Sequence, residues 1–365
     1  MALVGKDKQI GFINKTGRFV VRPIYDDAMP FRDGLAGVNI KGKWGFIDGN
    51  GSMIIKPKFD AVSNFVDGVA AASKDDLWGF INKKGDFIIE PKFDYARPYR
   101  EDFARVKQNR KWGFVDRSGN YIIEPKFSSA NDFNNGAARV KVGRRWGYID
   151  ARGEYIIKPK YKTAGDFNEG LARVKHGRSW GYVNKSGRFA IPARYSIAND
   201  FVDGLARVRS GGRIGFIDKS GKFVISPQFS DAYDFVEGMS MVKSGGRWGF
   251  INQKGLYSVE PKFEWAWNFN EGLAAVAYNG KWGFINKNGD YVIEPKFDAV
   301  HDFSEGLVAV EVKGKWGFLD KNGNSIIKPQ FNIVSPFEKC SELETAAKIN
   351  ENVENIEDVE VSING

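Results

Sequence analysis

The sequence predicts an all-β chain made of ten tandem repeats, each 34 residues long. A glycine that usually follows a tryptophan recurs at a constant step, with no insertion or deletion between copies. The ten glycines are Gly11, Gly45, Gly79, Gly113, Gly147, Gly181, Gly215, Gly249, Gly283 and Gly317. Turn residues stand at fixed distances after each of them, and glycines, prolines and β-branched pairs occupy positions that a 34-residue helical repeat needs for its helices. These observations exclude a helical array and favour a repeated three-stranded β-meander.

The strand that contains tryptophan and glycine, here called the Trp-Gly strand, is expected to lead into a hairpin. Trp112 to Val115 is one example. In all ten copies an Asp or Asn follows the central glycine by three residues, and a second glycine follows by six. This spacing predicts a tight turn that the Asp or Asn side chain caps and that a glycine closes with positive φ, next to a β-bulge.

Two further strands complete the repeat. The proline strand, such as Tyr121 to Phe127, carries a proline at one register in nine copies, which marks a strand end or an edge. The Ala-Val strand, such as Leu171 to Val174, alternates small apolar and basic residues, as a half-buried strand does. An aromatic residue ends every proline strand, and a second aromatic residue precedes every Ala-Val strand.

The apolar face of one such repeat is too small to be stable alone, so neighbouring repeats are expected to bury it. The tryptophans and the paired aromatic residues are expected to form one continuous core. Two arrangements satisfy these patterns: an open β-solenoid or superhelix, and a closed propeller-like ring. The open stack is preferred slightly, because the number of copies is free to vary in it. Met1 to Val4 matches a lone Ala-Val strand, which could complete the last repeat of a closed array.

These motifs resemble the WG-repeat family, which is named for its Trp-Gly pair. The resemblance rests on Lys-Trp-Gly-Phe-Ile-Asp/Asn, on Ile-Ile-x-Pro-Lys-Phe and on Phe-x-x-Gly-Leu-Ala-x-Val, and it covers residues 1 to about 337. It implies a bacterial β-repeat module of variable copy number that serves as an interaction domain. It brings no catalytic residue that could be transferred to this chain.

The charge of the chain is unevenly distributed. The formal net charge is +9 overall, whereas residues 338–365 carry eight acidic and two basic side chains. We therefore divide the chain into a basic array of ten repeats, residues 1–337, and an acidic tail, residues 338–365. In the tail, Ser341 and Glu344 form a capping-box pattern that is typical of a helix start. The tail is expected to be a capping helix or a linker.

Composition limits the other possibilities. The single cysteine excludes an intramolecular disulfide framework, and the two histidines argue against a histidine-rich metal site. No signal peptide or transmembrane pattern is present, so the cytoplasm is the default expectation for localisation. We find no nucleophile-and-base arrangement, phosphate loop or metal motif, and we expect neither a cofactor nor enzyme activity.

The most specific local signal is a pair of tryptophans, Trp265 and Trp267, that lies outside the repeat consensus. Tyr257 and Tyr278 belong to the same repeat. Exposed aromatic clusters are frequent contact sites for proteins and carbohydrates, so these four residues form the candidate partner-binding site. Local repacking against the neighbouring repeat is the alternative explanation.

A second candidate is a basic edge formed by the cations that follow the prolines. Aligned cations could track an anionic polymer, whereas the plain alternative is a solvated strand face that prevents edge-to-edge aggregation. The basic edge consists of Lys58, Lys92, Lys126, Lys160, Arg194, Lys262 and Lys296.

The sequence therefore favours a binding or scaffold module that presents a repetitive β surface to another protein. The alternatives are a binder of anionic polymers, such as nucleic acid or a cell-surface glycan, and a targeting module of a larger effector. Neither the oligomeric state nor the partner can be read from these patterns.

Overall fold

The computed structural model describes residues 1–338, and all of its regular secondary structure over this range is β-strand. The chain divides into two compact units. The first contains residues 1–92, 315–317 and 326–338, and the second contains residues 93–314 and 318–325. The all-β class predicted from the repeat is confirmed.

Each of the three predicted strands is present in every repeat. The Ala-Val strands are β1 (Ala2–Lys6), β5 (Leu35–Ile40), β9 (Val69–Lys74), β13 (Ala104–Gln108), β17 (Ala138–Val142), β20 (Leu171–His176), β24 (Ala206–Ser210), β28 (Met239–Ser244), β32 (Leu273–Tyr278) and β36 (Leu307–Val312). The Trp-Gly strands are β2 (Gln9–Ile13), β6 (Lys43–Asp48), β10 (Leu77–Asn82), β14 (Lys111–Val115), β18 (Arg145–Ile149), β21 (Ser179–Asn184), β25 (Arg213–Ile217), β29 (Arg247–Asn252), β33 (Lys281–Ile285) and β37 (Lys315–Asp320). The proline strands are β3 (Phe19–Tyr25), β7 (Met53–Phe59), β11 (Phe87–Phe93), β15 (Tyr121–Phe127), β19 (Tyr155–Tyr161), β22 (Phe189–Tyr195), β26 (Phe223–Phe229), β30 (Tyr257–Phe263), β34 (Tyr291–Phe297) and β38 (Ser325–Phe331).

A short fourth strand, which the sequence did not predict, precedes the Ala-Val strand in most sheets. These strands are β4 (Asp27–Ala28), β8 (Ala61–Val62), β12 (Tyr95–Ala96), β16 (Ser129–Ala130), β23 (Ile197–Ala198), β27 (Asp231–Ala232), β31 (Trp265–Asn270), β35 (Ala299–Val300) and β39 (Ile333–Val334). Apart from β31, they are two residues long, which is too short for an alternating pattern to be visible. In the sheet β20-β21-β22 only an isolated bridge, Ala164 to Val174, marks the place of the fourth strand.

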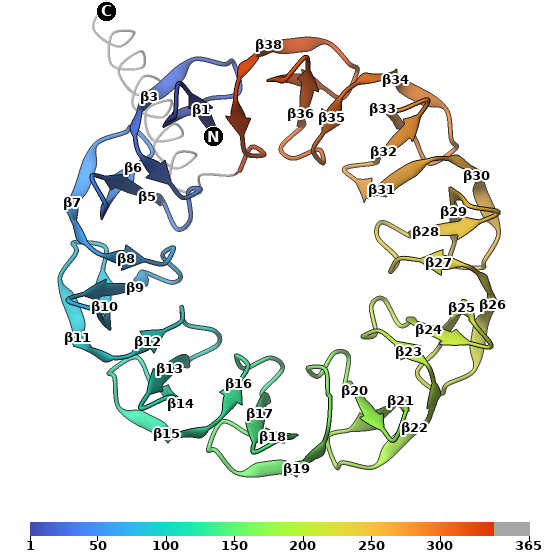
Figure 1. Ribbon diagram of the computed structural model, residues 1–365, viewed down its shortest axis with the longest axis horizontal. Coiled ribbons are helices and arrows are strands. Elements are labelled where there is room, and N and C mark those ends of the chain that lie inside the picture. Colours follow the sequence, from blue (N-terminus) through green and yellow to red (C-terminus); the bar gives the residue numbers. More distant parts are fainter. Residues whose placement is uncertain (339–365) are drawn as a thin grey trace, which may run out of the picture. The chain divides into compact units, whose positions relative to one another are not determined.

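The strands form antiparallel meanders of the kind found in propeller blades. In the second unit, for example, β27-β28-β29-β30 and β31-β32-β33-β34 are consecutive sheets, and their strands lie side by side in this order in Figure 1. The order places the short strand at one edge and the proline strand at the other, so prolines occupy an edge as predicted.

The two ends of the described chain meet in one sheet of the first unit, with the order β3-β2-β1-β39. β1 pairs with β39 through Val4 opposite Val334, and the N–H of Ser335 donates to the carbonyl of Leu3 at 2.8 Å. This pairing joins the first and last repeats. It supports the closed propeller arrangement of ten repeats over the open solenoid that the sequence slightly favoured.

The hairpin turns follow the predicted chemistry. In the second repeat, the Oδ1 atom of Asp48 accepts hydrogen bonds from the N–H groups of Asn50 and Ser52, at 2.9 and 2.8 Å. Gly51 closes the turn with a φ of 83°. A Cβ atom at Gly51 would lie 2.7 Å from a methyl carbon of Val21 in the preceding repeat, so this glycine is required by packing as well as by φ.

The glycine of the Trp-Gly pair is required for a different reason, which the sequence did not reveal. β29 and β30 change register on either side of Gly249: Trp248 faces Phe263, whereas Phe250 faces Val259. The intervening part of β30 bulges towards Gly249. A Cβ atom at Gly249 would lie 2.5 Å from the Val259 carbonyl oxygen. The proline strand therefore requires a residue without a side chain beneath it.

The core consists of clusters that consecutive sheets share. One contains Phe216 and Phe229 from one repeat together with Phe235 and Val242 from the next. The tryptophans of the Trp-Gly strands border these clusters instead of filling them. Trp248 is buried, whereas the other seven are half-buried, namely Trp44, Trp78, Trp112, Trp146, Trp180, Trp282 and Trp316. The prediction that neighbouring repeats bury the phenyl rings is confirmed. The prediction that the tryptophans join them in one continuous core is wrong, because most of the indoles are half-buried at the border of separate clusters.

The predicted capping box at Ser341 and Glu344, with the acidic tail from residue 339 on, lies outside the described residues, and the boundary between array and tail stays a prediction. Within residues 1–338, no helix has the length and apolar character needed to cross a membrane.

Candidate ligand-binding site

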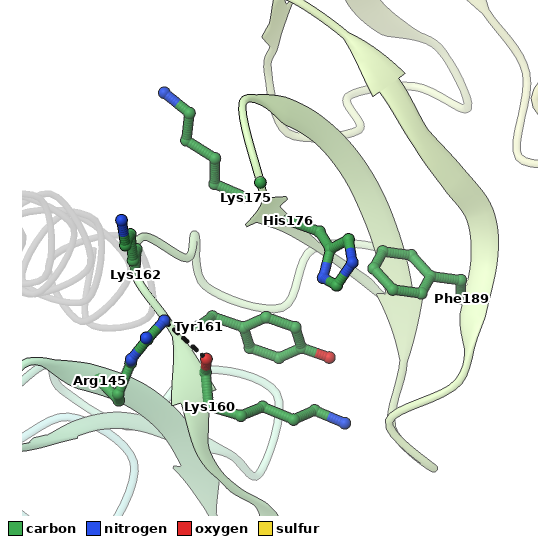
Figure 2. Close-up of a pocket in the computed structure, with 8 residues that line it drawn as sticks. Arg145, Lys160, Tyr161, Lys162, Lys175, His176 and Phe189 are labelled. Carbon is green, nitrogen blue, oxygen red and sulfur yellow. Dashed lines mark hydrogen bonds between the residues drawn. The ribbon is translucent and has the colours of Figure 1, made fainter.

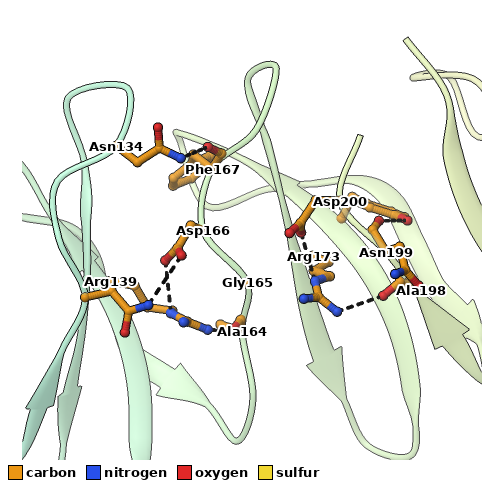
Figure 3. A network of polar contacts seen from close by, with 12 residues as sticks. Asn134, Arg139, Ala164, Gly165, Asp166, Phe167, Arg173, Ala198, Asn199 and Asp200 are labelled. Carbon is orange, nitrogen blue, oxygen red and sulfur yellow. Dashed lines mark hydrogen bonds and ion pairs between the residues drawn. The ribbon is translucent and has the colours of Figure 1, made fainter. Parts of the chain in front are cut away.

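A pair of arginine and aspartate recurs in four consecutive repeats of the second unit, and in three of them the arginine also lies over the tryptophan of its own repeat. Arg173 on β20 pairs with Asp200 at 2.8 Å and donates to the carbonyl of Ala198 at 3.1 Å (Figure 3). Its guanidinium carbon also lies 5.5 Å from the ring centroid of Trp180. The other three ion pairs of this kind are Arg105–Asp132, Arg139–Asp166 and Arg207–Asp234. Each arginine binds the repeat that follows its own, so the pair ties consecutive sheets together.

The arginine–aspartate pair is incomplete in the repeats that follow. The arginine position is occupied by Met241 and then by Ala275, so Asp302, which stands at the aspartate position opposite Ala275, has no arginine to face. Burial raises the pKa of Asp302, and the neighbouring His301 lowers it by a smaller amount. An exposed pocket that includes Asp302 lies at this place.

This pocket, here called the tryptophan pocket, has a volume of about 420 Å³. Trp265 and Trp267 lie on the same face of β31 and are 61% and 37% exposed, whereas Ala266 between them is buried. The pocket is lined by Tyr233, Met241, Trp248, Trp265, Ala266, Trp267, Asn268 and Asp302. The predicted pair of tryptophans is therefore brought together with aromatic and acidic side chains of the preceding and following repeats.

Ring contacts hold this pocket in shape. Trp267 packs against Trp282 with centroids 5.5 Å apart, and Tyr233 packs against Trp248 at 5.8 Å. The ammonium group of Lys243 lies 5.4 Å from the Trp248 ring and 5.9 Å from the Trp265 ring. Tyr233 thus lies against the buried indole of Trp248, and Trp267 lies against the half-buried indole of Trp282. In three earlier repeats an arginine takes this place over the indole.

The two tyrosines of the candidate partner-binding site do not join the tryptophans. Tyr257, on β30, packs edge-on against Phe229 of the preceding repeat, at 6.3 Å between centroids. Tyr278, at the end of β32, lines a separate pocket with Tyr291 and Lys262. All four residues are exposed, but only Trp265 and Trp267 share a pocket.

The basic edge has a repeated internal role. The Lys58 ammonium lies 5.1 Å from the ring centroid of the next residue, Phe59, and donates to the carbonyl of Gly85 in the following repeat at 3.0 Å. Arg194 makes the same two contacts, with Tyr195 and with Gly221. The cation–ring contact recurs at Lys126, Lys160, Lys262 and Lys296, and Lys92 also has interaction partners. These contacts show that the cations of the basic edge interact with their own chain, and both explanations of the edge stay predictions.

One member of the basic edge, Lys160, also lines a cationic pocket of about 370 Å³ (Figure 2). This basic pocket is lined by Arg145, Lys160, Tyr161, Lys162, Lys175, His176, Gly177 and Phe189. Arg145 reaches the carbonyl of Lys160 at 3.4 Å, and His176 packs against Phe189 at 5.8 Å. Among residues 1–338, no carboxylate lines the pocket. The pocket was not predicted from the sequence, although aligning the repeats by their 34-residue step places Lys162 at a position that is acidic in five others, at Asp26, Asp60, Asp94, Glu264 and Asp298.

Several of the carboxylates that precede Ala-Val strands make structural contacts. Glu169 accepts a hydrogen bond from the N–H of Gly204 and pairs with Lys219 at 2.8 Å, so that it connects three repeats. The hydrogen bond from Lys219 lowers the pKa of Glu169. Among residues 1–338, no three His, Cys, Asp or Glu side chains are grouped so that they could hold a metal ion.

The chain consists of repeated antiparallel meanders, its first and last repeats pair in one sheet, and its surface carries pockets. These features define a β-repeat module of the propeller type. The model of the WG containing repeat matches this chain ten times, at residues 10–44, 44–78, 78–112, 112–145, 146–178, 180–213, 214–248, 248–282, 282–316 and 316–340. The chain belongs to the WG-repeat family, as the resemblance indicated.

Comparison with known proteins adds support for the fold only. No curated protein matches the chain significantly. A crystal structure of a eukaryotic initiation factor is similar over 93% of this chain and 96% of that one, with a TM-score of 0.50 and 11% identity. Hsv2p of Kluyveromyces lactis aligns over 85% of this chain and 98% of its own, with a TM-score of 0.31 and 12% identity. PorZ, a surface component of the type-IX secretion system of Porphyromonas gingivalis, aligns over 73% of this chain and 44% of its own, with a TM-score of 0.30 and 12% identity.

Proposed function

We propose that this chain is a non-enzymatic binding module and that the tryptophan pocket is its contact site for a partner protein. Repeat propellers of this family are typical binding modules, which supports the general class. The observation that carries the specific proposal is the exposure of Trp265 and Trp267 in a single repeat, at the mouth of one pocket. Large aromatic side chains of this kind supply most of the binding energy in protein interfaces.

The pocket also has a polar element that a partner could use. Its carboxylate, Asp302, stands where four other repeats of the chain pair an aspartate with an arginine. A partner that buries an apolar side chain against Trp265 and Trp267 would satisfy the aromatic wall, and a basic group beside it would satisfy Asp302. The polymer-binding alternative has no comparable support, because cations of the basic edge contact rings and carbonyls of their own chain.

The experiment uses peptides selected from a random displayed library on the full chain. Their affinity is then measured for the wild type, for the double variant Trp265→Ala/Trp267→Ala and for Tyr155→Ala. Tyr155 is the control, because it is a 41% exposed aromatic residue on another sheet. We expect the double variant to lose about thirtyfold or more in affinity, since removing a central interface tryptophan costs about 2 kcal/mol or more.

The melting temperature separates binding from packing. If the tryptophans serve the partner, the double variant keeps a melting temperature close to that of Tyr155→Ala. Undiminished peptide binding, or a large fall in melting temperature of the double variant alone, would show that the two indoles serve local packing and would reject the proposal.

A further inference from the structure

The basic pocket stands at a position where other repeats contain an ion pair. Lys43 at the start of β6 pairs with Asp60, seventeen residues later, and Lys281 pairs with Asp298 at the same spacing. Arg247 pairs with Glu264 in the same way, at 3.5 Å. In the fifth repeat the cation is retained as Arg145, but the residue seventeen positions later is Lys162. The exchange removes the negative partner and adds a second positive charge.

The acidic side chain has a second task in those repeats, because it also accepts a hydrogen bond from a turn. Asp60 accepts from the N–H of Asp75 at 2.9 Å, and Asp298 accepts from the N–H of Lys313 at 2.7 Å. The corresponding turn residue in the fifth repeat is Gly177, which lines the basic pocket. Lys162 offers no acceptor to the Gly177 N–H. The pocket therefore presents a backbone donor together with the cations.

A further donor lies in the wall. Tyr161 is only 4% exposed, and its hydroxyl has no hydrogen-bond partner among the described residues, whereas the hydroxyl of the equivalent Tyr195 accepts from the Nε atom of Arg194 at 3.0 Å. Buried hydroxyls without a partner in their own chain are uncommon, and a bound ligand or water usually satisfies them. In Figure 2 the rings of Tyr161, His176 and Phe189 lie close together beside Lys160 and Arg145. Cationic and aromatic groups thus line the same small cavity.

We propose that the basic pocket is a binding site for a phosphate monoester. Replacing a carboxylate by an ammonium group changes the local charge by two units, and a phosphate monoester carries about −1.5 to −2 charges at pH 7. Its three oxygens accept charge-assisted hydrogen bonds from Arg145 and Lys162 and a backbone bond from Gly177. The cavity of about 370 Å³ suits a small phosphorylated group better than a polymer. This site is separate from the tryptophan pocket and does not depend on the function proposed for it.

The decisive variant is Lys162→Glu, which restores the acidic residue of the other repeats and so fills the pocket with the chain's own carboxylate. The matched control is Lys158→Glu. Lys158 is exposed on the same strand, β19, does not line the pocket and stands where Glu90, Glu124, Glu260 and Glu294 stand in other repeats. The two variants have the same net charge, and each introduces a residue that the fold already accommodates elsewhere.

Phenyl phosphate, inorganic phosphate and acetate are titrated into each protein, with heat and the amide chemical shift of Gly177 as readouts. We expect wild type and Lys158→Glu to bind phenyl phosphate alike, and Lys162→Glu to bind it about tenfold more weakly or worse. Tighter binding of phenyl phosphate than of inorganic phosphate identifies an ester as the ligand, and equal binding identifies the free anion, which corrects the ligand while keeping the oxyanion site. Equal affinities of all three proteins, binding of acetate as tight as that of phosphate, or no binding at all would overturn the proposal.

Discussion

Replacing Gly249 by alanine tests why the Trp-Gly strand of every repeat carries a glycine at this position. The added Cβ atom would lie 2.5 Å from the carbonyl oxygen of Val259 and 2.7 Å from the nitrogen of Pro261. These are backbone atoms, so β29 and β30 have to separate by about 1 Å before the contact becomes an ordinary one. Overpacking of this kind costs about 3 kcal/mol, at the upper end of its usual range, because no side chain can move aside.

The control for this prediction is Gly246→Ala, in the turn that leads into the same strand. Gly246 has a φ of 80°, but no atom lies within 4 Å of the position that its added Cβ atom would take. Only the left-handed conformation then opposes the substitution, at about 1–2 kcal/mol. Hydrogen exchange of the Phe250 and Val259 amides measures the local opening free energy in both variants. If Gly249→Ala destabilises β29 and β30 no more than Gly246→Ala does, the steric explanation of the Trp-Gly pair is wrong.

Two predictions concern charge. Arg173→Met should destabilise the chain by about 1–2 kcal/mol at neutral pH in urea unfolding, since the ion pair with Asp200 is half-buried. Burial already raises the pKa of Asp200, so the loss should shrink as acid protonates this residue, and a pH-independent loss would contradict this account. Asp302→Asn should instead stabilise the chain at neutral pH. Burial raises the folded-state pKa of Asp302 above its unfolded value, so wild type loses stability as the pH rises and this carboxyl group ionises. The neutral asparagine avoids this loss. The variant should therefore be more stable than wild type at pH 7 and lose this advantage in acid. A less stable variant at pH 7 would show that Asp302 has a favourable partner.

Local structure could be predicted from the sequence where the residues that determine it are close together in the chain. The capping of the hairpin by Asp48 and the positive φ of Gly51 follow from four consecutive residues, and both were predicted. The glycine at 249 was recognised as invariant among the repeats but not explained, because the Val259 oxygen that excludes a side chain lies ten residues away and approaches only after a change of register. The repeat pattern indicated that Met1 to Val4 could complete the last repeat, but an open stack satisfies the same pattern, so the closing pair of β1 and β39 was left as one of two alternatives.

The candidate sites show the same limit. Trp265 and Trp267 were found because they break the repeat, but Tyr233 and Asp302 come from the repeats before and after, and only the folded chain assigns them to the same pocket. The half-burial of the tryptophans was also missed, because an indole at the border of a core and one at its centre have the same sequence signal. The basic edge was visible as a row of cations, whereas the rings and carbonyls that it contacts were not.

The constant length of the repeats has a consequence for how such proteins acquire new specificity. Because each register position has the same backbone surroundings in every copy, a single codon change, such as the one that separates a lysine from a glutamate, is enough to convert an internal ion pair into an open receptor for a ligand. No loop has to be inserted and no strand has to be moved. A chain of this design can therefore explore different recognition chemistries in several copies at once while the remaining copies preserve its stability.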